Sequence, residues 1–131
     1  SISLDQLATL NAKKTGALIR CSCQCGAMLG GGSIKQISAA ENFGSELGIA
    51  FQITDDILDV IGDEKTVGKQ VRHDAQSGKA TWPAILGLDK ARSLAKQHCA
   101  SAVAALGGLF AHGPDTDFLC QTAQKLVDRT H

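Results

Sequence analysis

Apolar residues recur three or four positions apart along most of the chain, which is the spacing of one face of an α-helix. The pattern runs through residues 3–29 and stops at three glycines, 30–32. A second helix is expected from Ser33 to about Ile61, because Ser33 and Gln36 have the spacing of a capping box. In this second helix the apolar positions surround nearly the whole circumference, which is typical of a helix inside a bundle.

The second half of the chain has a different pattern. Residues 62–79 are rich in glycine and charge and poor in apolar residues, which predicts a long loop of the kind that often binds or covers a ligand. Helical character resumes at about Trp82. Asp89 is the expected N-cap of a helix that ends near Leu106, and a last helix is expected over 116–129. The sequence therefore predicts an all-α helical bundle of about five helices.

Length and charge restrict the choice of partners. The chain has 131 residues, enough for one domain, and 13 basic residues balance 13 acidic ones. A formal net charge of zero argues against broad electrostatic attraction to nucleic acid or to an anionic membrane. No apolar run reaches the roughly 20 residues that span a bilayer, so the protein is not expected to be transmembrane.

The five cysteines do not form a metal-binding pattern. Cys21, Cys23 and Cys25 alternate along the first helix without a CxxC spacing. A zinc site is the weaker interpretation, and small buried thiols are expected instead. Reduced cysteines favour a cytoplasmic location, with the plastid as an alternative.

Polar side chains interrupt the second helix within FQITDDILDVIGD, residues 51–63. Three aspartates lie three, four and seven positions after Gln52, namely Asp55, Asp56 and Asp59. At this spacing the four side chains fall on one side of the helix, which we call the polar stripe. Burying unpaired carboxylates costs several kcal/mol each, so basic side chains or cations are expected nearby. Mg²⁺ prefers oxygen ligands and often bridges one or two carboxylates to a phosphate. A solvated acidic helix face is the alternative interpretation.

Basic residues follow the polar stripe in the predicted loop, namely Lys65, Lys69, Arg72 and Lys79. Lys69 and Lys79 each follow a glycine, which lets backbone amides approach an anion, and lysines act as point charges on phosphate. Lys14 and Thr15, before a glycine in the first helix, form another possible phosphate contact. These groups could hold a metal–diphosphate against the carboxylates, or the lysines and carboxylates could simply pair. SGKAT at 77–81 lacks the spacing of a P-loop.

These motifs together resemble one family. KTGALI, FQITDDILD, GDEKTVGK, Asp74 and GKATWPA, in this order and spacing, resemble the trans-isoprenyl diphosphate synthases, which include farnesyl and geranylgeranyl diphosphate synthases. The resemblance extends from about Lys14 to Leu88. It implies an all-α bundle around a deep cavity, usually in a homodimer. It also implies condensation of an allylic diphosphate with isopentenyl diphosphate, assisted by Mg²⁺ or alternatively Mn²⁺.

The resemblance also implies roles for individual residues. DDILD is similar to the second aspartate-rich motif of the family, so Asp55 would be the direct metal ligand. Asp56 and Asp59 would act through metal-bound waters or hold lysines. The expected substrate-binding residues are Lys14, Thr15, Phe51, Gln52, Lys69 and Lys79, and the expected catalytic residues are Lys14, Thr15, Gln52 and Lys69. In this scheme the lysines bind diphosphate, while Phe51 contacts the isoprenoid.

The family's first aspartate-rich motif does not occur in the chain, because no second DDxxD is present. Residues 1–131 therefore resemble the C-terminal portion of a single prenyltransferase domain. The N-terminal half of the same enzyme or a complementary subunit is expected to complete the site, in a homo- or hetero-oligomer, and the chain alone is expected to be inactive. A non-catalytic interaction subunit and a fragment of a class I terpene cyclase are the alternatives.

Overall fold

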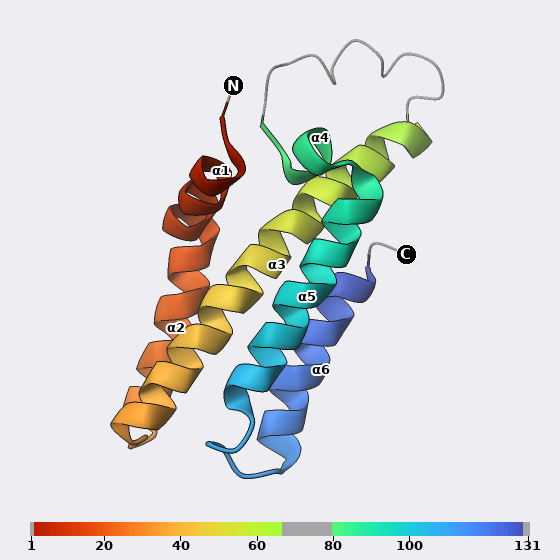
Figure 1. Cartoon of the computed structure of the whole chain (residues 1–131). Helices are drawn as coiled ribbons and strands as arrows, with labels where there is room; N and C mark the ends of the chain where they lie inside the picture. Colours follow the sequence, from red (N-terminus) through yellow and green to blue (C-terminus); the bar gives the residue numbers. More distant parts are fainter. Residues whose placement is uncertain (1, 67–79, 130–131) are drawn as a thin grey trace.

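The computed structural model describes residues 2–66 and 80–129, with only the backbone of residues 63–66. These residues form helices and no strand, which confirms the all-α prediction. The elements are α1 (Leu4–Asn11), a π-helical turn η1 (Ala12–Gly16), α2 (Ala17–Leu29), α3 (Ile34–Thr66), α4 (Trp82–Leu86), α5 (Leu88–Leu106) and α6 (Pro114–Asp128). Figure 1 shows α3 between α1 and α2 on one side and α5 and α6 on the other.

The first predicted helix is continuous but kinked. Ser3 and Gln6 form a capping box at its start, in which each side chain accepts a hydrogen bond from the backbone N–H of the other residue. The helix then passes through η1, where Lys14 has the non-helical angles φ −89° and ψ −108°. The capping box predicted for Ser33 and Gln36 is confirmed.

Three predicted boundaries are wrong. Helix α3 continues to Thr66, so the segment 62–66 is helical rather than part of a loop. Asp89 is not an N-cap, since α5 begins at Leu88 behind Gly87, whose φ is 83°. Asp89 instead lies in the first turn, where a carboxylate interacts favourably with the helix dipole. Helix α6 begins at Pro114, two residues before the predicted start.

The core lies mainly between α3 and α5. Small side chains on α5, mostly alanines, face larger side chains on α3, so the two helices can pack closely. The fully or nearly fully buried residues of these two helices include Phe43, Ala50, Ile53, Ile57, Ala91, Ala95 and Ala102. His98 adds a polar link, because its Nδ1 lies 2.7 Å from Oε2 of Glu46 on α3.

Two glycines of α3 let it approach the first helix backbone to backbone. A Cβ atom on Gly44 would lie 2.7 Å from Cα of Arg20, and one on Gly48 would lie 2.8 Å from Cα of Gly16. Both distances are shorter than real Cβ contacts. Between Gly44 and Gly48 the contact on the first helix moves back from Arg20 to Gly16, so the two helices are antiparallel. This register places Gln52, one turn beyond Gly48, level with η1.

The cysteine prediction is wrong for the alternating group. Cys21 and Cys25 are exposed and Cys23 is half-buried, because α3 covers only part of the α2 surface. The Sγ atoms of Cys21 and Cys25 lie 3.8 Å apart. All five cysteines are free thiols, and burial raises the pKa of Cys99 and of Cys23.

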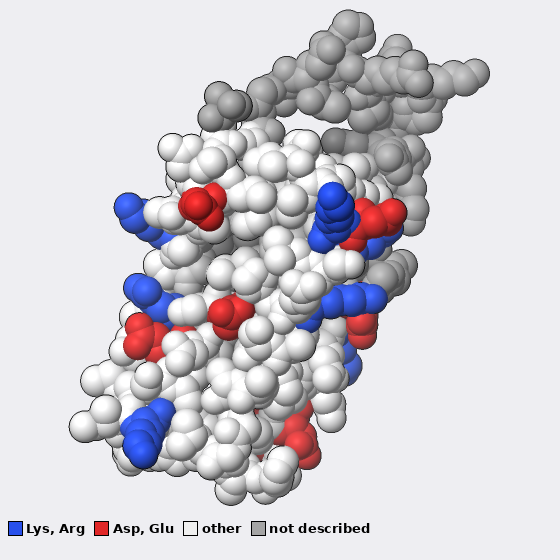
Figure 2. Space-filling model, viewed as in Figure 1, with Lys and Arg blue, Asp and Glu red and all other residues white. Residues whose placement is uncertain are grey.

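The surface of the described residues carries charges of both signs. Figure 2 shows basic and acidic side chains interspersed on the face it presents. None of the helices in the described ranges combines the length and the apolar character needed to cross a membrane.

Candidate functional site

The polar stripe lies in the second half of α3, and its three carboxylates differ in exposure. Asp55 and Asp59 are exposed, whereas Asp56 is only 8% exposed. Gln52 and Phe51, one turn earlier, are half-buried. Burial, from which nearby basic side chains or cations were expected, applies only to Asp56, whereas Asp55 and Asp59 are solvated as in the alternative interpretation. Helix α3 lies at the centre of the described structure, but the face with these two side chains is uncovered.

Both carboxylate oxygens of Asp56 accept hydrogen bonds. The backbone N–H of Trp82 donates to Oδ2 over 3.1 Å, and Nε2 of Gln52 donates to Oδ1 over 2.9 Å. Burial raises the pKa of Asp56, and the nearby Asp55 and Asp59 raise it further. The two hydrogen bonds act in the opposite direction, since they stabilise the charged form. Asp56 is thus a buried carboxylate with both oxygens occupied by donors.

Helix α4 brings the chain back to the polar stripe. Thr81 caps it, because Oγ1 of Thr81 accepts the backbone N–H of Ala84, and Pro83 occupies the first turn. Trp82 is buried at 4% exposure and is joined to α3 by the hydrogen bond to Asp56. Sequence reasoning missed the contact between α4 and Asp56. Its only local signal was a threonine followed by Trp-Pro, which is typical of a helix start.

Lys14 and Thr15 lie in η1, which contacts α3 at about the height of Gln52. Lys14 is exposed and Thr15 is half-buried. The non-helical backbone at Lys14 interrupts the regular ladder of backbone hydrogen bonds. Interruptions of this kind occur frequently at functional sites. The structure therefore brings Thr15, Lys14 and Gln52 to neighbouring elements, since η1 contacts α3.

The remaining predicted site residues cannot be placed in the same way. Lys69 and Lys79 lie outside the described residues, as do Arg72 and Asp74. The side chain of Lys65 also lies outside them. Their approach to the polar stripe stays a prediction.

The polar stripe offers part of the ligand set that a divalent cation needs. Among the described side chains, those of residues 2–62 and 80–129, no three of His, Cys, Asp or Glu are gathered as a metal site. Asp55 and Asp59 are nevertheless exposed carboxylates one helical turn apart. Mg²⁺ commonly uses one or two protein carboxylates and completes its shell with water and phosphate oxygens, so this pair suits it. The donors around Asp56 leave that side chain less suited to direct coordination.

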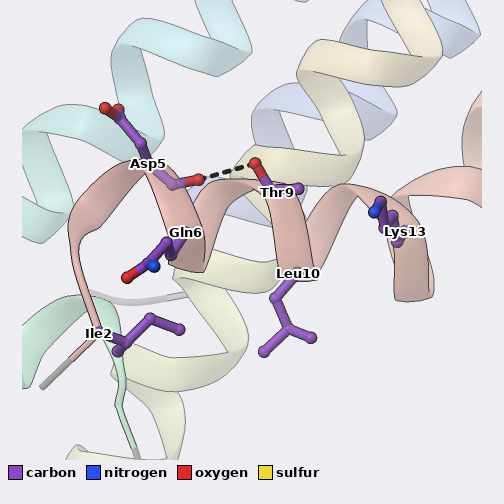
Figure 3. Close-up of a pocket in the computed structure, with 6 residues that line it drawn as sticks. All are labelled: Ile2, Asp5, Gln6, Thr9, Leu10 and Lys13. Carbon is purple, nitrogen blue, oxygen red and sulfur yellow. Dashed lines mark hydrogen bonds between the residues drawn. The ribbon is translucent and has the colours of Figure 1, made fainter.

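An open groove elsewhere contains none of the predicted site residues. It has a volume of about 640 Å³ and lies along α1. Figure 3 shows its lining residues, which are Ile2, Asp5, Gln6, Thr9, Leu10 and Lys13. The hydroxyl of Thr9 donates to the backbone oxygen of Asp5 over 2.8 Å, so it is already bonded within its own helix.

The all-α fold and the carboxylates on its central helix are the features that the resemblance to isoprenyl diphosphate synthases implied. Comparison with known proteins supports the same class. Residues 1–105 match the family described as Polyprenyl synthetase. The chain belongs to the polyprenyl synthetase family.

Relatives of known name support the same assignment. The chain is 38% identical over 129 residues to farnesyl diphosphate synthase of Escherichia coli (strain K12), a match that covers 98% of this chain and 43% of the relative. It is also 38% identical over 96 residues to "Heterodimeric geranylgeranyl pyrophosphate synthase large subunit 1, chloroplastic" of Arabidopsis thaliana, covering 73% and 26% of the two chains. The chain therefore spans less than half the length of these relatives.

Solved structures show the same fold. An FPP/GFPP synthase from Zymomonas mobilis in its apo form aligns with a TM-score of 0.78 and 31% sequence identity. The alignment covers 95% of this chain and 39% of that chain. The resemblance inferred from the sequence motifs is thereby confirmed at the level of family and fold.

Proposed function

We propose that the full-length protein carrying this sequence is a trans-prenyltransferase that condenses an allylic diphosphate with isopentenyl diphosphate. The observation that carries the proposal is the polar stripe, in which exposed Asp55 and Asp59 flank buried Asp56 on the central helix of a polyprenyl synthetase fold. The names of the relatives, which are farnesyl and geranylgeranyl diphosphate synthases, support this reaction class.

Asp55 and Asp59 would hold Mg²⁺, or Mn²⁺, with Asp55 as the direct ligand. A divalent cation held there would supply positive charge to stabilise a diphosphate leaving group. Lys14 is exposed on the neighbouring η1 and would contribute a further positive charge to the diphosphate. Lys69 and Lys79 are proposed for the same task.

The chain's other side chains would position the substrate and exclude water. Phe51 would contact the isoprenoid chain, while Thr15 and Gln52 would lie near the reacting carbons. The largely apolar interior between the helices would limit access of water to an allylic cation, which water would otherwise trap. These roles are consistent with the half-burial of Thr15, Phe51 and Gln52.

Residues 1–131 would form the C-terminal portion of one prenyltransferase domain. The other metal-binding motif and the isopentenyl diphosphate site would come from the N-terminal half of the enzyme or from a complementary subunit. One relative is named as the large subunit of a heterodimeric synthase, which supports an assembly of more than one chain. The cytoplasm or a plastid is the proposed location, and the same relative is named as chloroplastic.

A product assay tests the proposal directly. The full-length protein is incubated with Mg²⁺, isotope-labelled isopentenyl diphosphate and an allylic diphosphate of five, ten or fifteen carbons. The expected product is a labelled prenyl diphosphate longer than the allylic substrate by one or more five-carbon units. A folded protein that forms no elongated product would instead support a non-catalytic subunit. A cyclised hydrocarbon formed from the allylic substrate alone would indicate a terpene cyclase.

A further inference from the structure

We propose that Asp56 is a positioning residue that acts through Gln52. Its carboxylate holds the Gln52 amide with Nε2 turned inward, and this leaves Oε1 as the end of the amide available to the reaction. The orientation of the Gln52 amide is a property of the folded chain, whereas the use of Oε1 in prenyl transfer rests on the proposed function.

The hydrogen bonds around Asp56 define the orientation of the amide. The backbone N–H of Trp82 can only donate, so Oδ2 of Asp56 must be an acceptor. Oδ1 faces Gln52, with 2.9 Å to Nε2. Nε2 is the donor in this hydrogen bond and Oδ1 is the acceptor. If Gln52 turned its amide by half a rotation, two acceptor oxygens would face each other, so only one orientation is compatible with the carboxylate.

The surroundings make this constraint strong. Asp56 is 8% exposed, and Gln52 lies one helical turn before it on the same face of α3. Water competes less with hydrogen bonds on the buried side of Asp56, and Gln52 itself is half-buried. The bond to Trp82 also joins the carboxylate to the start of α4. The carboxylate of Asp56 is thereby fixed by α4 as well as by Gln52, so it cannot rotate together with the Gln52 amide.

The orientation matters for a reaction that develops positive charge. The amide oxygen carries partial negative charge, and the amide nitrogen carries partial positive charge on its hydrogens. An oxygen directed at an allylic carbon stabilises the cation that forms there, whereas an NH₂ group destabilises it. Asp56 therefore affects the transition state by determining which end of Gln52 is presented, without contacting substrate itself.

Asp56→Asn in the full-length protein separates orientation from shape. The substituted side chain can keep the bond to Trp82 through its oxygen and then presents an NH₂ group to Gln52. Gln52 must invert its amide to accept this bond. We expect kcat to fall by roughly 10²-fold, within the range seen when one transition-state contact is lost. KM for both substrates should stay within about threefold, because the binding lysines and the carboxylates of Asp55 and Asp59 are unchanged.

A second substitution should restore the oxygen. In the double variant Gln52→Glu with Asp56→Asn, one oxygen of the introduced glutamate accepts from the introduced asparagine, and the other takes the place of Oε1. We expect kcat of this double variant to recover at least about tenfold over Asp56→Asn alone. Gln52→Glu alone places two carboxylates against each other and should remain impaired. Asp115→Asn, at the start of α6, is the matched control and should keep wild-type kinetics.

A readout without catalysis follows the amide itself. In protein labelled with ¹⁵N-glutamine and free of substrate, the Gln52 side-chain NH₂ signal is assigned by its loss in Gln52→Leu. We expect slow hydrogen exchange of this group in the wild type and faster exchange in Asp56→Asn. Rapid exchange in the wild type would overturn the inferred orientation, whether or not the protein is a prenyltransferase.

The kinetic outcomes distinguish the two levels of the proposal. Wild-type kcat in Asp56→Asn would overturn the positioning role while leaving the proposed function intact. A loss of kcat without recovery in the double variant would also overturn it, because a purely structural or metal-binding role predicts no rescue. Absence of prenyl transfer by the wild type would refute the proposed function alone, and the exchange measurement would still decide the orientation of Gln52.

Discussion

Thr54, directly before the three aspartates, is a polar side chain in an apolar environment. It is fully buried, and its Oγ1 has no hydrogen-bond partner among the described residues. An unsatisfied buried hydroxyl costs free energy, because its hydrogen bonds to water are lost on folding. Asp56 lies only two residues further along α3, but its oxygens both have donors. Neighbouring polar residues of α3 thus differ in whether their burial is compensated.

Thr54→Val should therefore stabilise the protein. Valine has nearly the shape of threonine and a similar helix propensity, so the difference reports mainly the hydroxyl. We expect the free energy of unfolding of the full-length protein, measured in urea, to rise by about 1 kcal/mol. Thr54→Ser is the control, because it keeps the hydroxyl and removes a methyl group, and it should lower stability by about 1 kcal/mol. A loss of stability in Thr54→Val would show that the hydroxyl is satisfied.

At the scale of elements, the helices were predictable from the sequence and several of their ends were not. Apolar spacing is a property of the whole element and indicates the long helices over most of their length. The start of α5 depends on a glycine with positive φ, Gly87, and the first helix is kinked by the non-helical angles of a single residue, Lys14. Neither feature has a repeating pattern that could reveal it.

For the polar stripe, the sequence predicted which side chains share one side of α3 but not which of them are buried. The spacing of Asp55, Asp56 and Asp59 places them on one side of α3, as the structure shows. Periodicity cannot distinguish which of them is covered, because that depends on α4, whose Trp82 packs near Asp56. The cysteines of α2 show the same limit, since the pattern could not indicate that Cys21 and Cys25 face away from α3.

The contact between α3 and the first helix depends on glycine at position 48. Gly48→Ala would place a Cβ atom 2.8 Å from Cα of Gly16, so the helices would have to move apart. We expect a loss of about 1–3 kcal/mol in the free energy of unfolding, even though alanine favours helix.

Gly26→Ala on α2 is the matched control. It is a helical glycine whose added Cβ would meet nothing within 4 Å, so it should be neutral or stabilising by up to about 1 kcal/mol. Unchanged unfolding free energy in Gly48→Ala, measured in the same urea titration, would contradict the close helix contact.

At the scale of the whole molecule, the described residues leave apolar side chains exposed. Leu29 is 90% exposed, Ile34 87% and Leu18 71%, and all three lie on α2 or at the start of α3. A neighbouring helix in a larger bundle would bury apolar side chains of this kind. The chain also covers only 43% of a farnesyl diphosphate synthase relative.

Residues 1–131 expressed alone should therefore form no prenyl product. The polar stripe would be present, but the proposed second metal motif and the isopentenyl diphosphate site would be missing. The same product assay, with the full-length protein as a positive control, measures this. Prenyl transfer by residues 1–131 alone would show that these residues contain a complete site.

Asp55→Ala in the full-length protein tests whether the polar stripe holds the metal ion that prenyl transfer needs. Asp55 is exposed, so its loss should change the free energy of unfolding by no more than about 0.5 kcal/mol. The rate of prenyl transfer at saturating Mg²⁺ should fall by at least roughly 10²-fold, because the leaving diphosphate loses its main countercharge. Asp115→Ala should leave the rate unchanged. An Asp55→Ala protein that transfers prenyl groups at the wild-type rate would contradict a metal role for Asp55.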